Sequence, residues 1–84
     1  MYAVEFLPSA ARAFAKLDRA VQRRLAQRID RLAREPRQGD VRMLRGADDV
    51  WRLRVGDYRV LYRIEDDRLV ILVVKIGHRR DVYR

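Results

Sequence analysis

The pattern of apolar residues predicts a strand and two helices in the first half of this chain. Apolar residues alternate with others over residues 2–6, which is typical of a strand. A helix is expected to begin at Pro8, because proline is favoured in the first turn. A second helix follows, since apolar residues recur at spacings of four, four and three between residues 21 and 32. Asp18 is a suitable N-cap for this helix, and Pro36 ends it.

The second half of the chain predicts three strands joined by short turns. They span about residues 49–55, 58–65 and 68–76, and the last is apolar on both faces, as in a central strand. Residues 36–48 form a basic, irregular connection before them, and a short polar tail follows Gly77. This order predicts an α+β fold, β-α-α-β-β-β, with an N-terminal helical hairpin packed on one face of a mostly antiparallel four-stranded sheet.

The dipeptide Gly56-Asp57 predicts a hairpin with a defined register. A two-residue loop of this type joins antiparallel strands and places Arg54 opposite Arg59. Because side chains alternate between the two faces, Arg52 lies on the same face as this pair. The other face then carries apolar and aromatic residues: Trp51, Leu53, Val55, Tyr58, Val60 and Tyr62. Like charges placed opposite each other destabilise a sheet, so we infer that this arginine cluster holds an anion.

Charge and composition narrow the classes of function. The net charge is +8, and all but two of the 20 basic residues, Lys16 and Lys75, are arginines. This basicity indicates nucleic acid, an acidic protein partner, or both, although the helical arginines fit a solvated surface equally well. With no cysteine and one histidine, His78, neither a disulfide nor a metal centre is expected. We expect one soluble, cytoplasmic domain over residues 1–84, with no membrane span and no cofactor.

The arginine cluster has the chemistry to bind phosphate, because each guanidinium presents a planar fork of donors. The polar tail follows the central strand directly and is expected to bring further groups to the same face: His78, Arg79, Arg80 and Tyr83. Metal-free RNA cleavage requires an aligned 2′-hydroxyl, stabilisation of the phosphorane and a proton for the leaving 5′-oxygen. Arginines supply the second of these but are poor bases, since their pKa exceeds about 12. Taken alone, a histidine that follows a glycine, as His78 does, is more often a structural or exposed residue than a catalytic one.

Three segments together resemble the RelE toxins of bacterial and archaeal toxin–antitoxin modules. They are Leu44-Arg45-Gly46, the hairpin from Trp51 to Tyr62, and the run from Val74 to Tyr83 with its GHRRDVY sequence. The resemblance extends over nearly the whole chain. It implies the RelE/ParE toxin fold and an mRNA interferase that cuts messenger RNA in the ribosomal A site without a metal. In such enzymes the 2′-hydroxyl attacks its neighbouring phosphate, leaving a 2′,3′-cyclic phosphate and a 5′-hydroxyl.

The resemblance also implies roles for individual residues. By position, Arg52 and Arg54 match two basic residues on the strand before the turn, and Arg59 matches the arginine that stabilises the phosphate. Arg79 matches the proposed general acid, and Tyr83 matches the tyrosine that contacts the base. We expect these residues and His78 to form the catalytic site. Neighbouring basic residues are expected to bind RNA: Arg45, Arg63, Lys75, Arg80 and Arg84.

The chain departs from the RelE pattern at the residue expected to act as general base. The best-known RelE toxins carry lysines at the positions of Arg52 and Arg54, and one of those lysines is implicated in deprotonating the 2′-hydroxyl. An arginine is harder to deprotonate. We therefore expect Arg54 to orient and electrostatically activate the 2′-hydroxyl, while the proton leaves through ribosomal RNA, water or His78.

Two other functions fit parts of the sequence. ParE-type toxins share the fold and inhibit DNA gyrase, but their tails usually lack a terminal tyrosine, so Tyr83 and the arginine cluster favour the ribonuclease. A non-catalytic RNA-binding module is the third interpretation. The resemblance also implies a cognate RelB-like antitoxin, and the charge of +8 favours an acidic one that wraps the helices and covers the arginine cluster.

Overall fold

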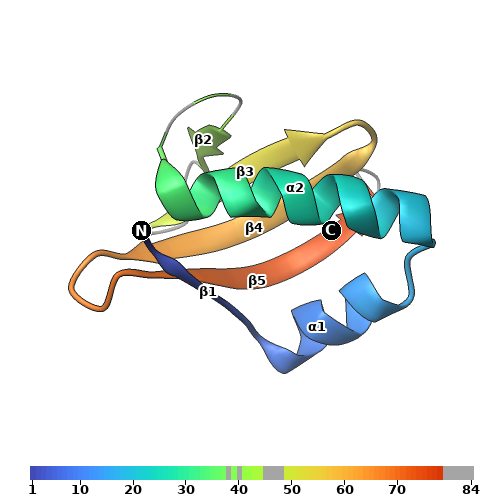
Figure 1. The fold of residues 1–84 in the computed structure, drawn as a ribbon, viewed down its shortest axis with the longest axis horizontal. Coiled ribbons are helices and arrows are strands. Elements are labelled where there is room, and N and C mark those ends of the chain that lie inside the picture. The colour runs from blue at the N-terminus through green and yellow to red at the C-terminus, as the bar shows by residue number, and fades with distance from the viewer. Residues whose placement is uncertain (38, 40, 45–48, 79–84) are drawn as a thin grey trace.

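The chain folds into a helical hairpin and a five-stranded sheet (Figure 1). The computed structural model describes residues 1–37, 39, 41–44 and 49–78. The elements, in chain order, are β1 (Ala3–Phe6), α1 (Pro8–Ala15), α2 (Arg19–Arg34), β2 (Val41–Met43), β3 (Val50–Val55), β4 (Tyr58–Glu65) and β5 (Val70–His78).

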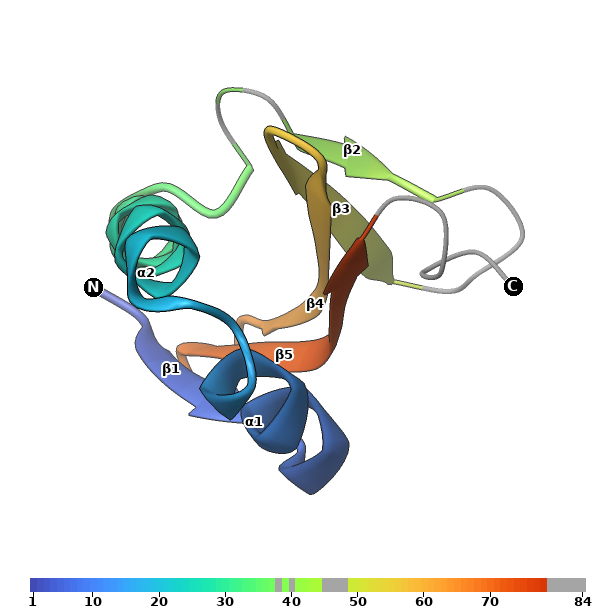
Figure 2. The same cartoon turned by 90° about the vertical axis from the view of Figure 1, so that its right-hand side faces the viewer.

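The sheet is mixed, with the strand order β1-β5-β4-β3-β2. Only β1 and β5 pair in parallel, and the other neighbours are antiparallel. The strands curve around one side, where α2 lies, and α1 packs beside β5 (Figure 2). The predicted α+β class, the helical hairpin and the mostly antiparallel sheet are therefore confirmed.

The strand β2 corrects the prediction of four strands. It lies inside the connection that the sequence predicted to be irregular, and it pairs with β3 at the edge of the sheet. Three residues are too short to show an alternating pattern, so pairing with β3 decides this conformation rather than local sequence. The last predicted strand, about residues 68–76, also differs from β5, which begins at Val70 and continues through Gly77 to His78.

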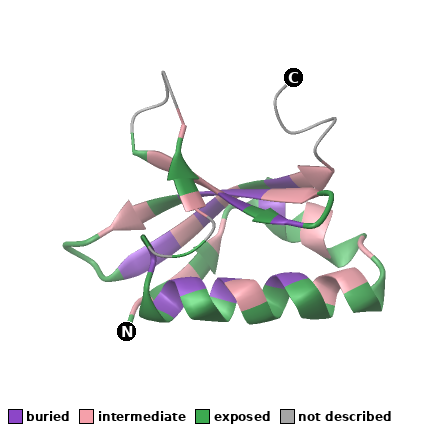
Figure 3. Ribbon diagram, turned by 90° about the horizontal axis from the view of Figure 1, so that it is seen from above, coloured by how far each residue is buried: buried purple, intermediate pink, exposed green. Residues whose placement is uncertain are grey.

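The helices begin where the sequence predicts. Pro8 occupies the first turn of α1, and the Asp18 carboxylate caps α2 by accepting a hydrogen bond from the Val21 amide at 2.9 Å. The predicted apolar stripe of α2 faces the sheet, as the buried positions in Figure 3 show. Its buried residues are Leu25, Ile29, Leu32 and Ala33. Neither helix in the described part of the chain is long and apolar enough to span a membrane.

The predicted faces of the hairpin are also confirmed. The residues of β3 and β4 that point toward the helices form the centre of the hydrophobic core: Leu53, Val55, Val60 and Tyr62. Trp51 and Tyr58 lie on the same face and are half-buried. The arginine cluster is consequently directed to the opposite face of the sheet, away from the core.

Tyr62 joins the core to the end of α2. Its ring is fully buried, and its hydroxyl donates a hydrogen bond to the Pro36 carbonyl at 2.7 Å. Burial raises the pKa of Tyr62, because the ionised phenolate would be poorly solvated in the core. This bond fixes the start of the connection between α2 and β2.

Replacing Tyr62 by phenylalanine is expected to lower the free energy of unfolding by about 1–3 kcal/mol, since the buried Pro36 carbonyl loses its partner. For a domain of this size, each kcal/mol corresponds to roughly 4–8 °C in Tm, measurable by thermal unfolding. Tyr58→Phe removes a hydroxyl from the same strand at a half-buried position and is expected to change stability by less than about 0.5 kcal/mol. Equal losses in both variants would contradict the assigned role of the Tyr62 hydroxyl.

A second polar cluster fixes the same connection from outside. The Tyr2 hydroxyl donates a 2.5 Å hydrogen bond to the Asp66 carboxylate, which also pairs with the Arg37 guanidinium at 2.7 Å. The Arg37 hydrogen bond, followed by that of Tyr2, lowers the pKa of Asp66. Arg37 also lies over the Trp51 ring, 5.9 Å from its centroid. These contacts connect the chain start, the β4–β5 turn and the residue that follows Pro36.

Candidate functional site

The open side of the sheet carries two rows of residues that place basic side chains together. One row crosses four strands: Arg42 lies opposite Arg52, Arg52 opposite Leu61, and Leu61 opposite Lys75. In the next row Arg54 lies opposite Arg59, and Arg59 lies opposite Gly77 of β5. The predicted register of the hairpin is therefore confirmed. We call the basic residues on this side of the sheet the basic face: Arg42, Arg52, Arg54, Arg59, Arg63 and Lys75.

Arg59 occupies the centre of the basic face. It is half-buried between Arg54 on β3 and Gly77 on β5, which contributes no side chain. Its Nε and Nη1 atoms are buried and receive no hydrogen-bond acceptor from the described residues. A buried donor without an acceptor costs about 1–3 kcal/mol, and more when it is charged. This arrangement suits a bound anion, because a phosphate supplies acceptors to both nitrogens at once.

The ion pairs of the described residues lie away from Arg59. Arg68 pairs with Glu65 at 2.7 Å and with Glu5 at 3.3 Å, close to the β4–β5 turn. No ion pair between described residues involves Arg54 or Arg59. Among the described residues, the acidic side chains that pair with arginine therefore lie at the turn end of the sheet rather than beside Arg54 and Arg59.

His78 is not placed with the arginines, which corrects the prediction that it joins them. It lies opposite Tyr58, and the two rings meet edge to face at 5.8 Å between centroids. Tyr58 belongs to the helix-facing side of the sheet. His78 takes this side because β5 continues past its predicted end, so alternation assigns His78 the face of the buried Ile76 rather than that of Gly77.

The remaining predicted site residues divide into two groups. Arg63 and Lys75 lie on the basic face and are exposed, so their predicted contacts with RNA are sterically open. The others lie outside the residues that the structure describes, and their roles stay predictions: Arg45, Arg79, Arg80, Tyr83 and Arg84. Sequence reasoning missed Arg42, whose place opposite Arg52 depends on the unpredicted strand β2.

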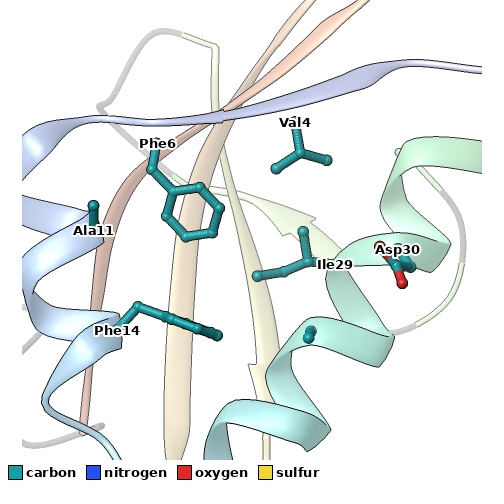
Figure 4. A pocket seen from close by; sticks show the side chains of 7 residues that line it. Val4, Phe6, Ala11, Phe14, Ile29 and Asp30 are labelled. Carbon is teal, nitrogen blue, oxygen red and sulfur yellow. The ribbon is translucent and has the colours of Figure 1, made fainter.

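A hollow lies on the helix side of the sheet (Figure 4). It measures about 360 Å³ and is lined mainly by apolar side chains of β1, α1 and α2. Phe6 and Phe14 meet there edge to face, with centroids 5.8 Å apart, and Asp30 is its one charged lining residue among those described. This hollow lacks the donors needed to bind a phosphate. Within the described ranges, no cluster of three His, Cys, Asp or Glu residues is arranged to hold a metal ion.

Comparison with known proteins places this geometry in one family. The sequence model of the family described as the ParE toxin of the type II toxin–antitoxin system parDE matches residues 4–83. A putative RelE-like toxin protein of Escherichia coli is 34% identical, with 98% of this chain and 90% of that protein covered. Toxin RelG of Mycobacterium tuberculosis is 31% identical, with 99% and 97% covered.

Solved structures agree with this assignment. The archaeal RelE–RelB complex from Pyrococcus horikoshii contains a chain with a TM-score of 0.79 and 32% identity, covering 96% of this chain and 98% of that one. The intact Escherichia coli RelBE toxin–antitoxin complex gives a TM-score of 0.84 and 25% identity, covering 93% and 96%. The chain therefore belongs to the RelE/ParE superfamily of type II toxin–antitoxin systems, as a RelE-type toxin.

Proposed function

We propose that this toxin is a metal-independent endoribonuclease that cuts messenger RNA on the ribosome and thereby stops translation in the cytoplasm. The observation that carries the proposal concerns Arg59, at the centre of the basic face. Its Nε and Nη1 atoms are buried and have no hydrogen-bond acceptor among the described residues. The mRNA interferase toxin RelE of Escherichia coli, which is 29% identical over 93% of this chain, supports the same reaction class.

The reaction proposed for this site is an internal transfer of phosphate. The 2′-hydroxyl attacks the adjacent phosphorus, the bond to the 5′-oxygen breaks, and the products carry a 2′,3′-cyclic phosphate and a 5′-hydroxyl. Arg59 stabilises the extra negative charge of the phosphorane through its two buried donors. Arg54, directly opposite, orients the attacking hydroxyl. By resemblance, Arg79 protonates the leaving oxygen and Tyr83 stacks on a base.

The proton of the 2′-hydroxyl is proposed to leave through water or ribosomal RNA. Arg52 and Arg54 are poor acceptors, because guanidinium remains protonated in proteins. His78 was a third candidate, but its ring contacts Tyr58 on the other side of the sheet. In this proposal the ribosome supplies part of the catalytic site, which is a physical reason for mRNA cleavage to depend on the ribosome.

His78→Ala is accordingly expected to keep the cleavage rate within about threefold of wild type, since its side chain does not reach the proposed phosphate. Arg54→Gln, on the basic face, is expected to slow the same reaction by about tenfold to a hundredfold, because it removes a charged donor beside the reacting groups. Single-turnover cleavage of ribosome-bound mRNA measures both rates. A large loss of rate in His78→Ala together with a wild-type rate in Arg54→Gln would reverse these assignments.

The decisive test of the proposed function is a cell-free translation reaction with purified toxin. Mapping of mRNA 5′ ends is expected to reveal new ends within translated codons, and omission of ribosomes is expected to remove most of them. Stalled translation with intact mRNA would reject the proposal.

One observation favours a second function. The matching family model takes its name from the ParE toxin, so inhibition of DNA gyrase belongs in the same test. Supercoiling of relaxed plasmid by purified gyrase is expected to proceed normally in the presence of this toxin. A block of supercoiling together with intact mRNA would assign the chain to that function instead.

A RelB-like antitoxin is the proposed protein partner. The RelE chains of the Pyrococcus and Escherichia coli structures were solved as complexes with RelB. A toxin of net charge +8 favours an acidic chain that folds on binding. Purification of the tagged toxin at native expression from its host is expected to recover a small acidic protein encoded beside it. Recovery of the toxin alone would count against this partner.

A further inference from the structure

A groove beside the basic face is lined by arginines from both the helix and the sheet. It lies between α2 and the edge formed by β2 and β3, and its volume is about 600 Å³. Four of the lining residues are arginines, and none of the described ones is acidic. We call this the β2 groove, defined by Arg28, Gly39, Val41, Arg42, Arg52, Arg54 and Gly56.

Arg28 distinguishes this groove from the general basic surface of α2. The other arginines of the helix are exposed, whereas Arg28 is half-buried. It follows the buried Leu25 by three positions and precedes the buried Leu32 by four, so it lies on the flank of the helix that turns toward the sheet. The helix therefore directs Arg28 into the groove, where it joins Arg42 from β2.

Two glycines keep the groove open. Gly39 and Gly56 have φ angles of +85° and +59°, a conformation that favours glycine, and neither fills the groove with a side chain. A Cβ atom on Gly56 would lie 2.8 Å from Nη2 of Arg24, so the Arg24 side chain of α2 reaches the hairpin turn.

We propose that the β2 groove binds the phosphate that neighbours the scissile one in the RNA chain, with Arg28 and Arg42 as its phosphate-binding residues. The inference rests on the proposed ribonuclease function and extends its site. Arg52 and Arg54 belong both to the groove and to the basic face, so a single strand held by them continues from one to the other. Such contacts position RNA without reading its sequence.

The lining of the groove favours RNA over an acidic protein segment. Val41 is the one bulky apolar residue among the described lining residues, and the rest are arginines and glycines. A protein segment that folds on binding depends on buried apolar anchors, which this groove does not offer. The backbone of a single strand needs mainly cations along its path, and four arginines supply them.

The test compares two double variants that remove the same charge from different places. R28Q/R42Q removes the groove arginines, and R19Q/R23Q removes two exposed arginines of α2 that lie outside the groove. The probe is a single-stranded 2′-O-methyl RNA of mixed sequence, which has no free 2′-hydroxyl and stays intact. Its affinity is measured over a range of salt concentrations, after thermal unfolding has shown that both variants fold.

The slope of log K against log salt is expected to fall by about 0.7 in R28Q/R42Q, the value for the one phosphate that these two arginines bind, and to stay near wild type in R19Q/R23Q. R28K/R42K keeps the charges and is expected to restore most of the slope. Equal slopes in the two glutamine variants would overturn the proposal. Binding of a polyglutamate peptide that is stronger than that of RNA and lost in R28Q/R42Q would also overturn it, in favour of an acidic protein.

Failure of the groove and failure of the nuclease give different results. If the wild-type toxin cleaves mRNA during translation and R28Q/R42Q binds the probe with the wild-type slope, the groove proposal fails alone. If no cleavage occurs but the slope still depends on Arg28 and Arg42, the groove binds single strands and the proposed reaction is wrong.

Discussion

Replacement of Arg59 by glutamine is expected to slow mRNA cleavage by about 10²–10³-fold, the usual cost of removing one preorganised donor from a developing oxyanion. The reason is the position of its guanidinium. Two of its nitrogens are buried without an acceptor, so their donors are already desolvated and directed before the phosphate arrives. Single-turnover cleavage on programmed ribosomes measures the chemical step, and a constant excess of toxin over ribosomes removes differences in binding.

Arg63→Gln is the matched control for this prediction. Arg63 lies four residues along β4 on the same face, but it is exposed, and its loss removes the same charge. It is expected to reduce the rate less than about tenfold. Arg59→Lys keeps the charge but loses the planar fork, so it is expected to recover only a small part of the activity. Equal losses in Arg59→Gln and Arg63→Gln would mean that total charge matters and the buried donors do not.

The placement of Arg59 was predictable because a short turn leaves the hairpin little freedom. The two-residue loop at Gly56-Asp57 permits one register, and that register determines which residues lie opposite each other and which share a face. Gly56 has the positive φ that such a turn requires. The pairing of Arg54 with Arg59 therefore followed from the sequence alone, as did the burial of Leu53 and Val60 on the other face.

The strand β2 was missed for the opposite reason, because tertiary pairing rather than local sequence determines it. β2 has three residues, and its conformation depends on backbone hydrogen bonds to β3 that no local pattern reveals. Its absence from the prediction also removed Arg42 from the candidate site. Arg28 was hidden for a related reason, since the helical pattern shows that it borders the apolar stripe but not which part of the sheet it meets. Both residues required tertiary structure.

His78 shows how a strand boundary changes a site. The apolar run of β5 carries hydrophobic residues on both faces, so its pattern could not assign faces to the residues that follow it. An irregularity in its pairing with β4, near Leu61 and Tyr62, shifts the alternation by one further residue. Only the resulting pairing of Tyr58 with His78 reveals that the histidine lies on the helix side, away from Arg59.

Removal of the attacking 2′-hydroxyl from the substrate is expected to have the largest effect of all. An mRNA with a single 2′-deoxynucleotide at the mapped cleavage site is expected to be cut at least about 10⁵-fold more slowly there, because a well-oriented internal nucleophile contributes an effective molarity of about 10⁵–10⁸ M. The phosphate that Arg59 binds is unchanged, so the modified mRNA is expected to compete with unmodified mRNA at nearly equal affinity. Primer extension at the modified position measures cleavage, and competition measures binding.

The 2′-deoxy substitution separates phosphate binding by the basic face from the chemical step of cleavage. Undiminished competition with abolished cleavage would assign the arginines to phosphate binding and charge stabilisation, with the nucleophile supplied by the RNA itself. A 3′ end that carries a 2′,3′-cyclic phosphate in the unmodified product would agree, because water as the nucleophile gives a linear phosphate. Cleavage of the deoxy-substituted mRNA at a comparable rate would require an attacking water and a base to activate it. The basic face offers only guanidinium groups and Lys75 among its described cations, so such a result would place that base outside it.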